Sequence, residues 1–256
     1  MIDGSEFAFV GAATLAGFCA CFVECVEVLV VVLALTLVRG WPAVLAGSSA
    51  GLLVLFFATR VLVAFLAGVP GSTVHLIVGV LLLLFGLRWL RGAMLRSLRA
   101  IPLPDLAALY AKEVAEIGAL NRCDAAFDFV AAARALKTTI CNGVEVAFVV
   151  AALGAGNAGL LAPAAAGALV SALVIVPFGF VFYRPIAAPI INSLKLAAGV
   201  LLSAFGTIWA GNGIGTEWPR LDVAIVVLAA GYLLVAIGYV RMARRGSSAD
   251  SRGVSG

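Results

Sequence analysis

Long apolar runs, separated by short polar breaks, dominate the chain from residue 7 onward. A helix needs about 20 apolar residues to cross a bilayer, and the pattern predicts about seven such helices. We expect them at roughly 8–37, 43–68, 72–92, 130–154, 159–183, 187–210 and 219–240. The breaks include RGWP, GVPGS and GNGIGTEWP, whose glycines and prolines favour tight turns between antiparallel neighbours. The expected fold class is therefore an all-α polytopic membrane protein.

Composition agrees with this pattern. Hydrophobic residues make up 64% of the 256 residues and charged residues only 12%, about half the charge of an ordinary soluble domain. Lipid must therefore surround most of the chain. The net charge of +4 does not indicate a nucleic-acid partner, because the basic residues follow the membrane topology. The start, MIDGSEFAFV, lacks the basic region of a signal peptide, so we expect residue 7 onward to be mature membrane protein.

Two segments differ from the spans. Residues 93–128 mix both signs of charge, and the stretch PDLAALYAKEVAEIGAL within them has helical spacing with a polar face. We expect a cytoplasmic linker with an amphipathic helix at the membrane surface. Residues 241–256 are polar and are expected to form a disordered cytoplasmic tail.

The basic residues near the span ends predict the orientation. Cytoplasmic loops of membrane proteins carry an excess of Lys and Arg. If the N-terminus lies outside, nearly all these residues fall on the cytoplasmic side and Arg220 is essentially the one left outside. We therefore expect a multi-pass protein of the inner (plasma) membrane with its N-terminus outside and its C-terminus in the cytoplasm.

The sequence also contains an internal repeat. GVLLLLFGLRW at 79–89 matches GVLLSAFGTIW at 199–209, and the tripeptide VEV occurs at 26–28 and again at 144–146. LAGSSAGLLV in the second span resembles LAPAAAGALV in the fifth. The matches occur in one order at a nearly constant offset, which predicts a first repeat at 7–92 and a second at 129–211.

Each predicted repeat holds three spans, and an odd number inverts the second copy in the membrane. Inverted repeats are typical of transporters, whose sites lie near the bilayer midplane where the copies meet. The span at 219–240 has no partner and is expected to be an added seventh helix.

Acidic residues interrupt the first and fourth spans at equivalent positions of the repeat. Glu24 and Glu27 lie in FVECVEVLV, and Asn142 and Glu145 lie in ICNGVEVAF. Residues three apart share one helix face, so crossing of the two spans would bring three carboxylates and one amide together. A carboxylate at that depth is costly unless it is paired, protonated or coordinated. Oxygen ligands suit Ca²⁺, Mn²⁺, Mg²⁺ and iron, which predicts a metal site formed by these four residues.

Other polar residues leave alternatives open. The glutamates could instead be neutral, hydrogen-bonded core residues. Cys25 and Cys141 flank the motif and could add softer ligands or could simply be small packing residues, and the spacing of the five cysteines predicts no disulfides. Arg60 could neutralise a motif glutamate or could extend toward the interface. His75 and Lys195 are equivalent in the repeat, and they fit either interfacial positions or a proton relay.

The layout of seven spans as 3+3+1, with VECVE at 23–27 and CNGVE at 141–145, resembles the oxidase-linked iron permease family of the iron/lead transporter group. That family carries an Arg-Glu-Gly-x-Glu motif in its first and fourth spans. Here Val23 and Cys141 stand at the two arginine positions, and Asn142 replaces one glutamate.

The resemblance implies that Glu24, Glu27 and Glu145 carry the metal, with Asn142 as a weaker fourth ligand. The expected function is a permease for a metal cation, iron or another divalent or trivalent ion, working by alternating access. An exporter of a small organic cation or amino acid and a non-transporting membrane subunit remain the alternatives. No catalytic constellation indicates an enzyme, and the only cofactor-like species expected is the transported metal. The expected partners are lipid, the cation and either a second copy or an accessory subunit.

Overall fold

The computed structural model describes residues 4–103, 105–119, 127–182, 188–218 and 220–253. In these ranges the secondary structure is helical, as expected for an all-α membrane protein. The helices are α1 (Gly4–Arg39), α2 (Trp41–Ala67), α3 (Gly71–Ser97), α4 (Leu106–Gly118), α5 (Phe129–Gly156), η1 (Ala158–Leu160), α6 (Leu161–Phe182), α7 (Ala188–Gly213) and α8 (Leu221–Gly253). Seven of the described helices, all but α4 and η1, are long and apolar enough to cross a membrane.

Local sequence determines where several helices begin. Gly40 separates α1 from α2 with a φ of 91°, a conformation that suits glycine, and a proline follows in the first turn of α2. Asp105 and Asp128 cap α4 and α5 by accepting hydrogen bonds from backbone N–H groups of the first turn, at 3.0–3.1 Å for Asp105 and 3.0 Å for Asp128. The helices therefore begin close to the positions that the hydrophobic pattern predicts.

The last helix is longer than predicted. We expected residues 241–256 to be a disordered tail, but α8 continues to Gly253, and residues 254–256 lie outside the described part. The segment contains no proline, and Ala and Arg near its start are good helix formers. Arg244 also donates a hydrogen bond of 2.8 Å to the backbone carbonyl of Ser97, which ties the C-terminal half of α8 to the end of α3.

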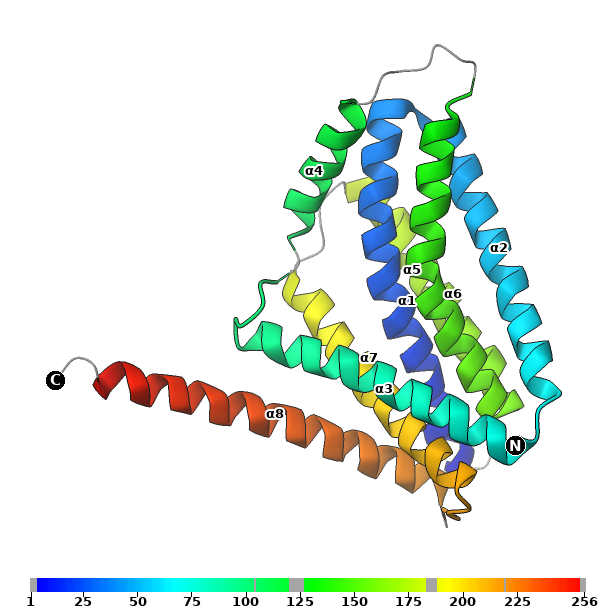
Figure 1. The fold of residues 1–256 in the computed structure, drawn as a ribbon, viewed down its shortest axis with the longest axis vertical. Helices are drawn as coiled ribbons and strands as arrows, with labels where there is room; N and C mark the ends of the chain where they lie inside the picture. The colour runs from blue at the N-terminus through cyan, green and yellow to red at the C-terminus, as the bar shows by residue number, and fades with distance from the viewer. Residues whose placement is uncertain (1–3, 104, 120–126, 183–187, 219, 254–256) are drawn as a thin grey trace.

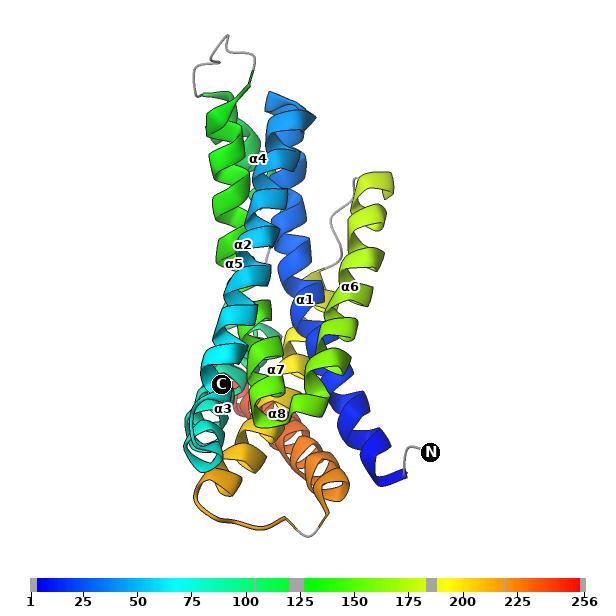
Figure 2. The same cartoon turned by 90° about the vertical axis from the view of Figure 1, so that its right-hand side faces the viewer.

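The helices form three extensive pairs. These pairs are α3 with α7, α2 with α5, and α1 with α6. Figures 1 and 2 show α1, α2 and α5 side by side along the long axis, with α1 and α5 running in opposite directions. Figure 1 also shows α3 and α8 crossing that direction steeply. In the predicted repeat, α1, α2 and α3 correspond to α5, α6 and α7. The pair α1–α6 then corresponds to α5–α2, and α3–α7 pairs two corresponding helices with each other. The observed pairing supports the inverted repeat, which stays a prediction.

Close approach at the α3–α7 crossing is reciprocal. A Cβ on Gly86 would lie 2.9 Å from the carbonyl oxygen of Gly199, and a Cβ on Gly199 would lie 3.0 Å from that of Gly86. A Cβ on Gly206 would likewise lie 2.8 Å from the carbonyl oxygen of Gly79, while a Cβ on Gly79 would meet the backbone of Trp209 and Ala210. Small residues let membrane helices pack backbone to backbone. The two matching sequence stretches at 79–89 and 199–209 therefore form one contact.

The core lies around α1 and α7. About 56% of the apolar window of α1 and 61% of that of α7 are buried within the protein, against 11% for α2 and α8. Phe205 and Trp209 of α7 are fully or almost fully buried at the centre of the largest apolar cluster, which also includes residues of α1, α3 and α5. The acidic residues of α1 therefore belong to one of the two most enclosed helices.

The linker helix α4 lies beside the half of α1 that ends at Arg39. Leu106, at its start, belongs to an apolar cluster with Val26 and Leu29, while Ile117, near its end, packs with Leu35. We expected an amphipathic helix at the membrane surface. In the structure α4 runs alongside α1, as Figure 1 shows, with its apolar face buried against that helix. The position of α4 relative to the membrane stays a prediction.

Candidate functional site

Helix α1 places Glu24 and Glu27 one turn apart in the interior. Glu24 is buried, with 5% of its surface exposed, and the side chain of Glu27 is 33% exposed. Lys195 reaches Glu27 from α7, with its ammonium nitrogen 3.1 Å from the Oε1 atom of the carboxylate. The side chain of Lys195 is only 16% exposed, so this ion pair is shielded from the surroundings.

Helix α5 contributes Glu145, whose side chain is 24% exposed. The guanidinium of Arg88, on α3, lies 3.7 Å from the Oε1 atom of Glu145. Arg88 itself is 71% exposed and also sits over the ring of Phe85, 5.9 Å from its centroid. Since the contact is long and one partner is exposed, this ion pair is weaker than the one between Lys195 and Glu27.

Glu24 lies within electrostatic range of the other two predicted carboxylates. Glu24 is close enough to Glu27, Glu145 and Lys195 for their charges to act on it. No residue that the structure describes forms a hydrogen bond or an ion pair with the Glu24 carboxyl. Helices α1 and α5 thus bring carboxyl groups of both sequence motifs within electrostatic range of one another, and the most buried of them, Glu24, has no direct partner among the described residues.

Asn142, the fourth predicted ligand, is used differently. Its amide nitrogen donates a hydrogen bond of 2.9 Å to the backbone carbonyl of Thr138, one turn earlier on α5. The amide nitrogen is therefore bonded within α5 and does not reach the carboxyl groups. The role of the amide oxygen as a metal ligand stays a prediction.

The described residues contain no group of three or more His, Cys, Asp and Glu side chains arranged to hold a metal ion. The ion pairs suggest a physical reason, since Glu27 and Glu145 each turn an oxygen toward a cationic side chain. A metal ion bound by both carboxylates would have to replace these contacts. The predicted metal site therefore stays a prediction that requires rearrangement of the side chains.

The three possible accessory residues of the site, Cys25, Cys141 and Arg60, differ in how exposed they are. Cys25 is half-buried on α1, and its sulfur lies 3.4 Å from that of Cys21. Cys141 is exposed on α5. Arg60 is exposed on α2 and pairs with none of the described acidic residues. The role of neutralising a motif glutamate, which the sequence offered to Arg60, belongs to Lys195 and Arg88 in the structure.

Sequence reasoning missed the partners of the glutamates. His75 and Lys195 occupy equivalent positions of the predicted repeat, but the Nε2 atom of His75 donates a hydrogen bond of 2.8 Å to the carbonyl oxygen of Gly156. Lys195 turns inward to Glu27 instead. One signal was present, because Lys195 is the only charged residue of its otherwise apolar span.

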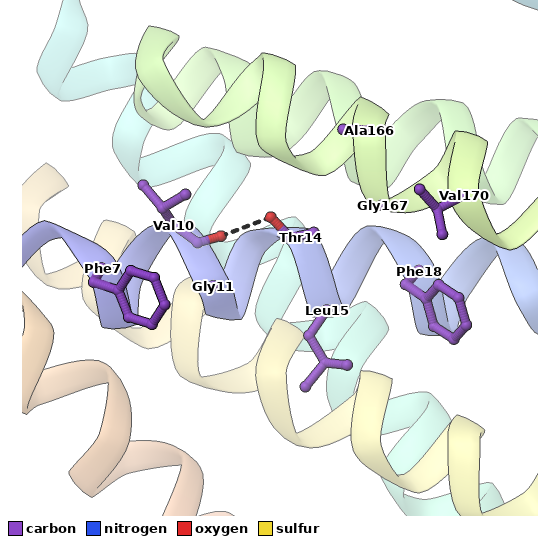
Figure 3. A pocket seen from close by; sticks show the side chains of 9 residues that line it. All are labelled: Phe7, Val10, Gly11, Thr14, Leu15, Phe18, Ala166, Gly167 and Val170. Atoms are coloured by element: carbon purple, nitrogen blue, oxygen red, sulfur yellow. Dashed lines mark hydrogen bonds between the residues drawn. The ribbon is translucent and has the colours of Figure 1, made fainter. Parts of the chain in front are cut away.

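An apolar groove of about 490 Å³ lies between α1 and α6, at some distance along α1 from the glutamates. Figure 3 shows its lining, which includes Phe7, Leu15, Phe18 and Val170. Thr14 lines it too, but its hydroxyl donates to the carbonyl oxygen of Val10, 3.0 Å away. With no charged group in its lining, this groove is not the candidate site.

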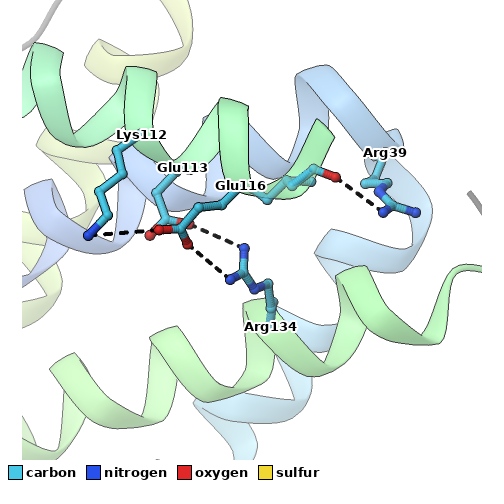
Figure 4. A network of polar contacts seen from close by, with 6 residues as sticks. Arg39, Lys112, Glu113, Glu116 and Arg134 are labelled. Atoms are coloured by element: carbon cyan, nitrogen blue, oxygen red, sulfur yellow. Dashed lines mark hydrogen bonds and ion pairs between the residues drawn. The ribbon is translucent and has the colours of Figure 1, made fainter. Parts of the chain in front are cut away.

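A second polar network holds the linker helix in place, as Figure 4 shows. Arg39, whose side chain is 2% exposed, donates hydrogen bonds to Asp128 at 3.1 Å and to the carbonyl oxygen of Ile117 at 3.2 Å. Arg134 pairs with Glu113 at 3.6 Å and with Glu116 at 3.3 Å. These contacts join the end of α1, the start of α5 and helix α4 into one unit.

Comparisons of the chain with protein-family models, with curated proteins and with solved structures find no match. The resemblance to the iron permeases therefore stays an expectation based on the two short motifs and the predicted 3+3+1 layout.

Proposed function

We propose that this multi-pass membrane protein is a transporter for a cation, with a metal cation such as iron or another divalent or trivalent ion as the first candidate. The carboxyl groups of Glu24, Glu27 and Glu145 bind the cation, and Asn142 lies beside them. The supporting observation is the gathering of these three groups from α1 and α5, with Glu24 buried. We assign no enzymatic activity and no resident cofactor to the chain.

The surroundings of the carboxyl groups favour a binding role over a purely structural one. Acidic groups inside membrane spans are costly and mark ion pathways in many transporters. A glutamate kept only for packing would be expected to have a hydrogen-bond partner, as buried polar groups usually do. None of the described residues provides one for Glu24. An arriving cation would supply the missing partner.

The two ion pairs support a mechanism in which the cargo competes with built-in cations. Lys195 and Arg88 neutralise Glu27 and Glu145 when cargo is absent. Bound cargo takes over these carboxylates, and the displaced cationic side chains move aside. The loaded and empty states then carry different contacts between α1, α5 and their neighbours, which is what alternating access requires.

A specific observation favours a small organic cation as the second candidate. The groups now paired with Glu27 and Glu145 are an ammonium and a guanidinium. A primary amine or guanidine compound would replace them with like chemistry, and it would need no group of three ligands. The described residues contain no such group of His, Cys, Asp and Glu.

The proposal is tested by measuring the thermal stability of the detergent-purified protein with a panel of metal ions and of small organic amines. A ligand that binds only the folded state raises the melting temperature in a concentration-dependent way. We expect a shift with one class of cation that disappears in Glu27→Gln and in Glu145→Gln. If no cation shifts the melting temperature and both variants are at least as stable as the wild type, the carboxyls are structural and the chain is a membrane subunit of another kind.

We also propose the orientation that the basic residues predict, with the N-terminus outside the inner membrane and the C-terminus in the cytoplasm. A cysteine at position 5 (Ser5→Cys) should react with a membrane-impermeant maleimide in intact spheroplasts, whereas Ser247→Cys should react only after lysis. The background for this test replaces Cys141, which is exposed. The reverse labelling pattern would show that the N-terminus lies in the cytoplasm and the C-terminus outside.

A further inference from the structure

Two thiols on α1 lie directly against each other beside the acidic site. Cys21 and Cys25 are four residues apart, which places them on one face of the helix. Their sulfur atoms are 3.4 Å apart. Cys21 is buried, with 7% of its surface exposed, and Cys25 is half-buried. Neither thiol belongs to the predicted set of oxygen ligands, although Cys25 flanks it.

The surroundings of this pair contain two further polar groups. Glu24 lies between the two cysteines in sequence and close enough to both for their charges to interact. Ser171 of α6 is fully buried and lies beside the Cys21 thiol. The hydroxyl oxygen of Ser171 makes no hydrogen bond of good geometry within the described structure. A buried and unsatisfied oxygen therefore faces one end of the thiol pair.

We propose that Cys21 and Cys25 form a dithiol site for a soft metal ion of low coordination number, of the class of Cu(I) and Ag(I). Thiolates prefer such ions over the hard cations that suit carboxylates. A metal–sulfur bond is about 2.3 Å long for zinc thiolates, so two sulfurs on one similar ion lie no more than about 4.6 Å apart. Because two-coordinate ions of this class bind their two ligands in a line, the sulfurs would stand near that limit, farther apart than the 3.4 Å observed. Binding therefore requires the two thiols to move apart.

The binding step balances without any oxidant or reductant. Two S–H bonds break, two metal–sulfur bonds form, and two protons leave. The metal keeps its oxidation state. With a monovalent ion, the resulting complex carries one negative charge. Lys195 on the neighbouring helix α7 is close enough to act on Glu24, but its positive charge is shared with Glu27, to which it is paired. Two ligands suffice for such an ion, so the site needs no third His, Cys, Asp or Glu side chain.

This inference rests on the proposed transport of a cation, but it names a monovalent, thiophilic metal ion as the cargo in place of the divalent or trivalent ion considered above. The ion would bind first at the dithiol, next to Glu24, and would then bind to the carboxyl groups as it crosses the membrane. Binding at the dithiol and transport through the protein can be measured separately, so either can fail without the other.

The test uses the full-length protein in detergent, reduced and then freed of reductant. Cys123 and Cys141 are replaced by serine, which leaves Cys19, Cys21 and Cys25. Cu(I) is titrated in competition with a chromophoric Cu(I) chelator, and the bound metal is counted by elemental analysis. We expect one tightly bound ion per chain. Either Cys21→Ser or Cys25→Ser should weaken binding by more than the roughly 10- to 100-fold that the loss of an outer-shell partner costs.

Cys19→Ser is the matched control, because Cys19 is also buried on α1, with 1% of its surface exposed, but forms no hydrogen bond with either thiol of the pair. It should leave the affinity unchanged. Cys21→Ala provides a second variant, and each variant must keep its melting temperature within a few degrees of its parent. Unchanged Cu(I) affinity in folded Cys21→Ser and Cys25→Ser would overturn the proposal, as would equal losses in Cys19→Ser.

Transport assays then separate the two proposals. Intact Cu(I) binding without flux of any cation would keep the dithiol site and overturn the transport function. Flux of a hard or organic cation that depends on Glu27 but not on Cys21 or Cys25 would keep the transport function and overturn the dithiol as a cargo site.

Discussion

The ammonium nitrogen of Lys195 lies 3.1 Å from the Oε1 atom of Glu27, across the contact between α7 and α1. Both side chains are largely withdrawn from the surroundings, at 16% and 33% exposure. This pair joins α7 to the acidic motif of α1. It therefore couples the charge state of the candidate site to the packing of the two most enclosed spans.

Replacing Lys195 by methionine should destabilise the protein, because Glu27 loses the cation that offsets its burial. We expect a loss of about 1–3 kcal/mol in the free energy of unfolding, the usual range for an unsatisfied buried group. Adding Glu27→Gln to Lys195→Met should recover part of this loss, with a coupling energy of about 1–2 kcal/mol in a double-mutant cycle. Denaturant unfolding in detergent measures all four proteins. Strictly additive effects would show that the two groups do not interact.

Arg88→Gln is the matched comparison at the second ion pair. Its guanidinium lies farther from the Glu145 carboxylate, at 3.7 Å, and its side chain is 71% exposed. Exposed pairs contribute about 0–1 kcal/mol. Arg88→Gln should therefore change the unfolding free energy much less than Lys195→Met does.

The α3–α7 crossing should be intolerant of added side-chain volume. In Gly79→Ala, the new methyl group would meet the backbone of Trp209 and Ala210, which cannot yield as a flexible side chain would. Overpacking of this kind costs about 1–3 kcal/mol, and we expect a corresponding fall in melting temperature.

Gly231→Ala is the control for this prediction. Gly231 lies within α8, where nothing is within 4 Å of an added Cβ, and alanine favours helix by up to about 1 kcal/mol over glycine. This variant should be neutral or slightly more stable. Equal effects of the two substitutions would contradict the close helix contact that the structure places at Gly79.

Arg39 should determine how firmly the linker helix is held. Arg39→Ala removes the hydrogen bonds to Asp128 and to the carbonyl oxygen of Ile117, and it leaves the mostly buried Asp128 carboxylate without that cation. We expect a loss of about 2–4 kcal/mol. Amide hydrogen exchange should accelerate across α4 more than across α3. Arg241→Ala, at an exposed site on α8, is the control and should leave hydrogen exchange in α4 unchanged. If α4 exchanges as slowly in Arg39→Ala as in the wild type, Arg39 does not hold the linker helix in place.

The order and approximate extent of the spanning helices follow from the sequence, because the apolar runs are long and their breaks contain glycine and proline. The predicted break before residue 43 corresponds to Gly40, and the predicted span at 187–210 corresponds to α7, Ala188–Gly213. The segment 241–256 is the exception. Its polar composition favours disorder, but α8 continues through it to Gly253.

The site was predictable only in part. Spacing and the predicted repeat single out Glu24, Glu27 and Glu145, and the structure places Glu24 within electrostatic range of the other two. Their role as a binding site stays a prediction. The partners were not predictable, because they depend on how α3 and α7 cross α1 and α5. Asn142 was assigned to the site from its position, yet its amide nitrogen bonds to its own helix. The contact between Cys21 and Cys25, by contrast, follows from a spacing of four residues, which the sequence displays directly.

The most direct test of the central claim is cation flux through the purified protein in sealed liposomes. Uptake of a panel of metal ions and organic amines would be measured for wild type, Glu24→Gln, Glu27→Gln and the neutral control Gly231→Ala. The account predicts saturable flux of one class of cation in wild type and in Gly231→Ala, and a loss of at least about tenfold in both glutamine variants. Flux that persists in Glu24→Gln and Glu27→Gln, with both proteins folded, would contradict a transport site formed by these carboxyl groups.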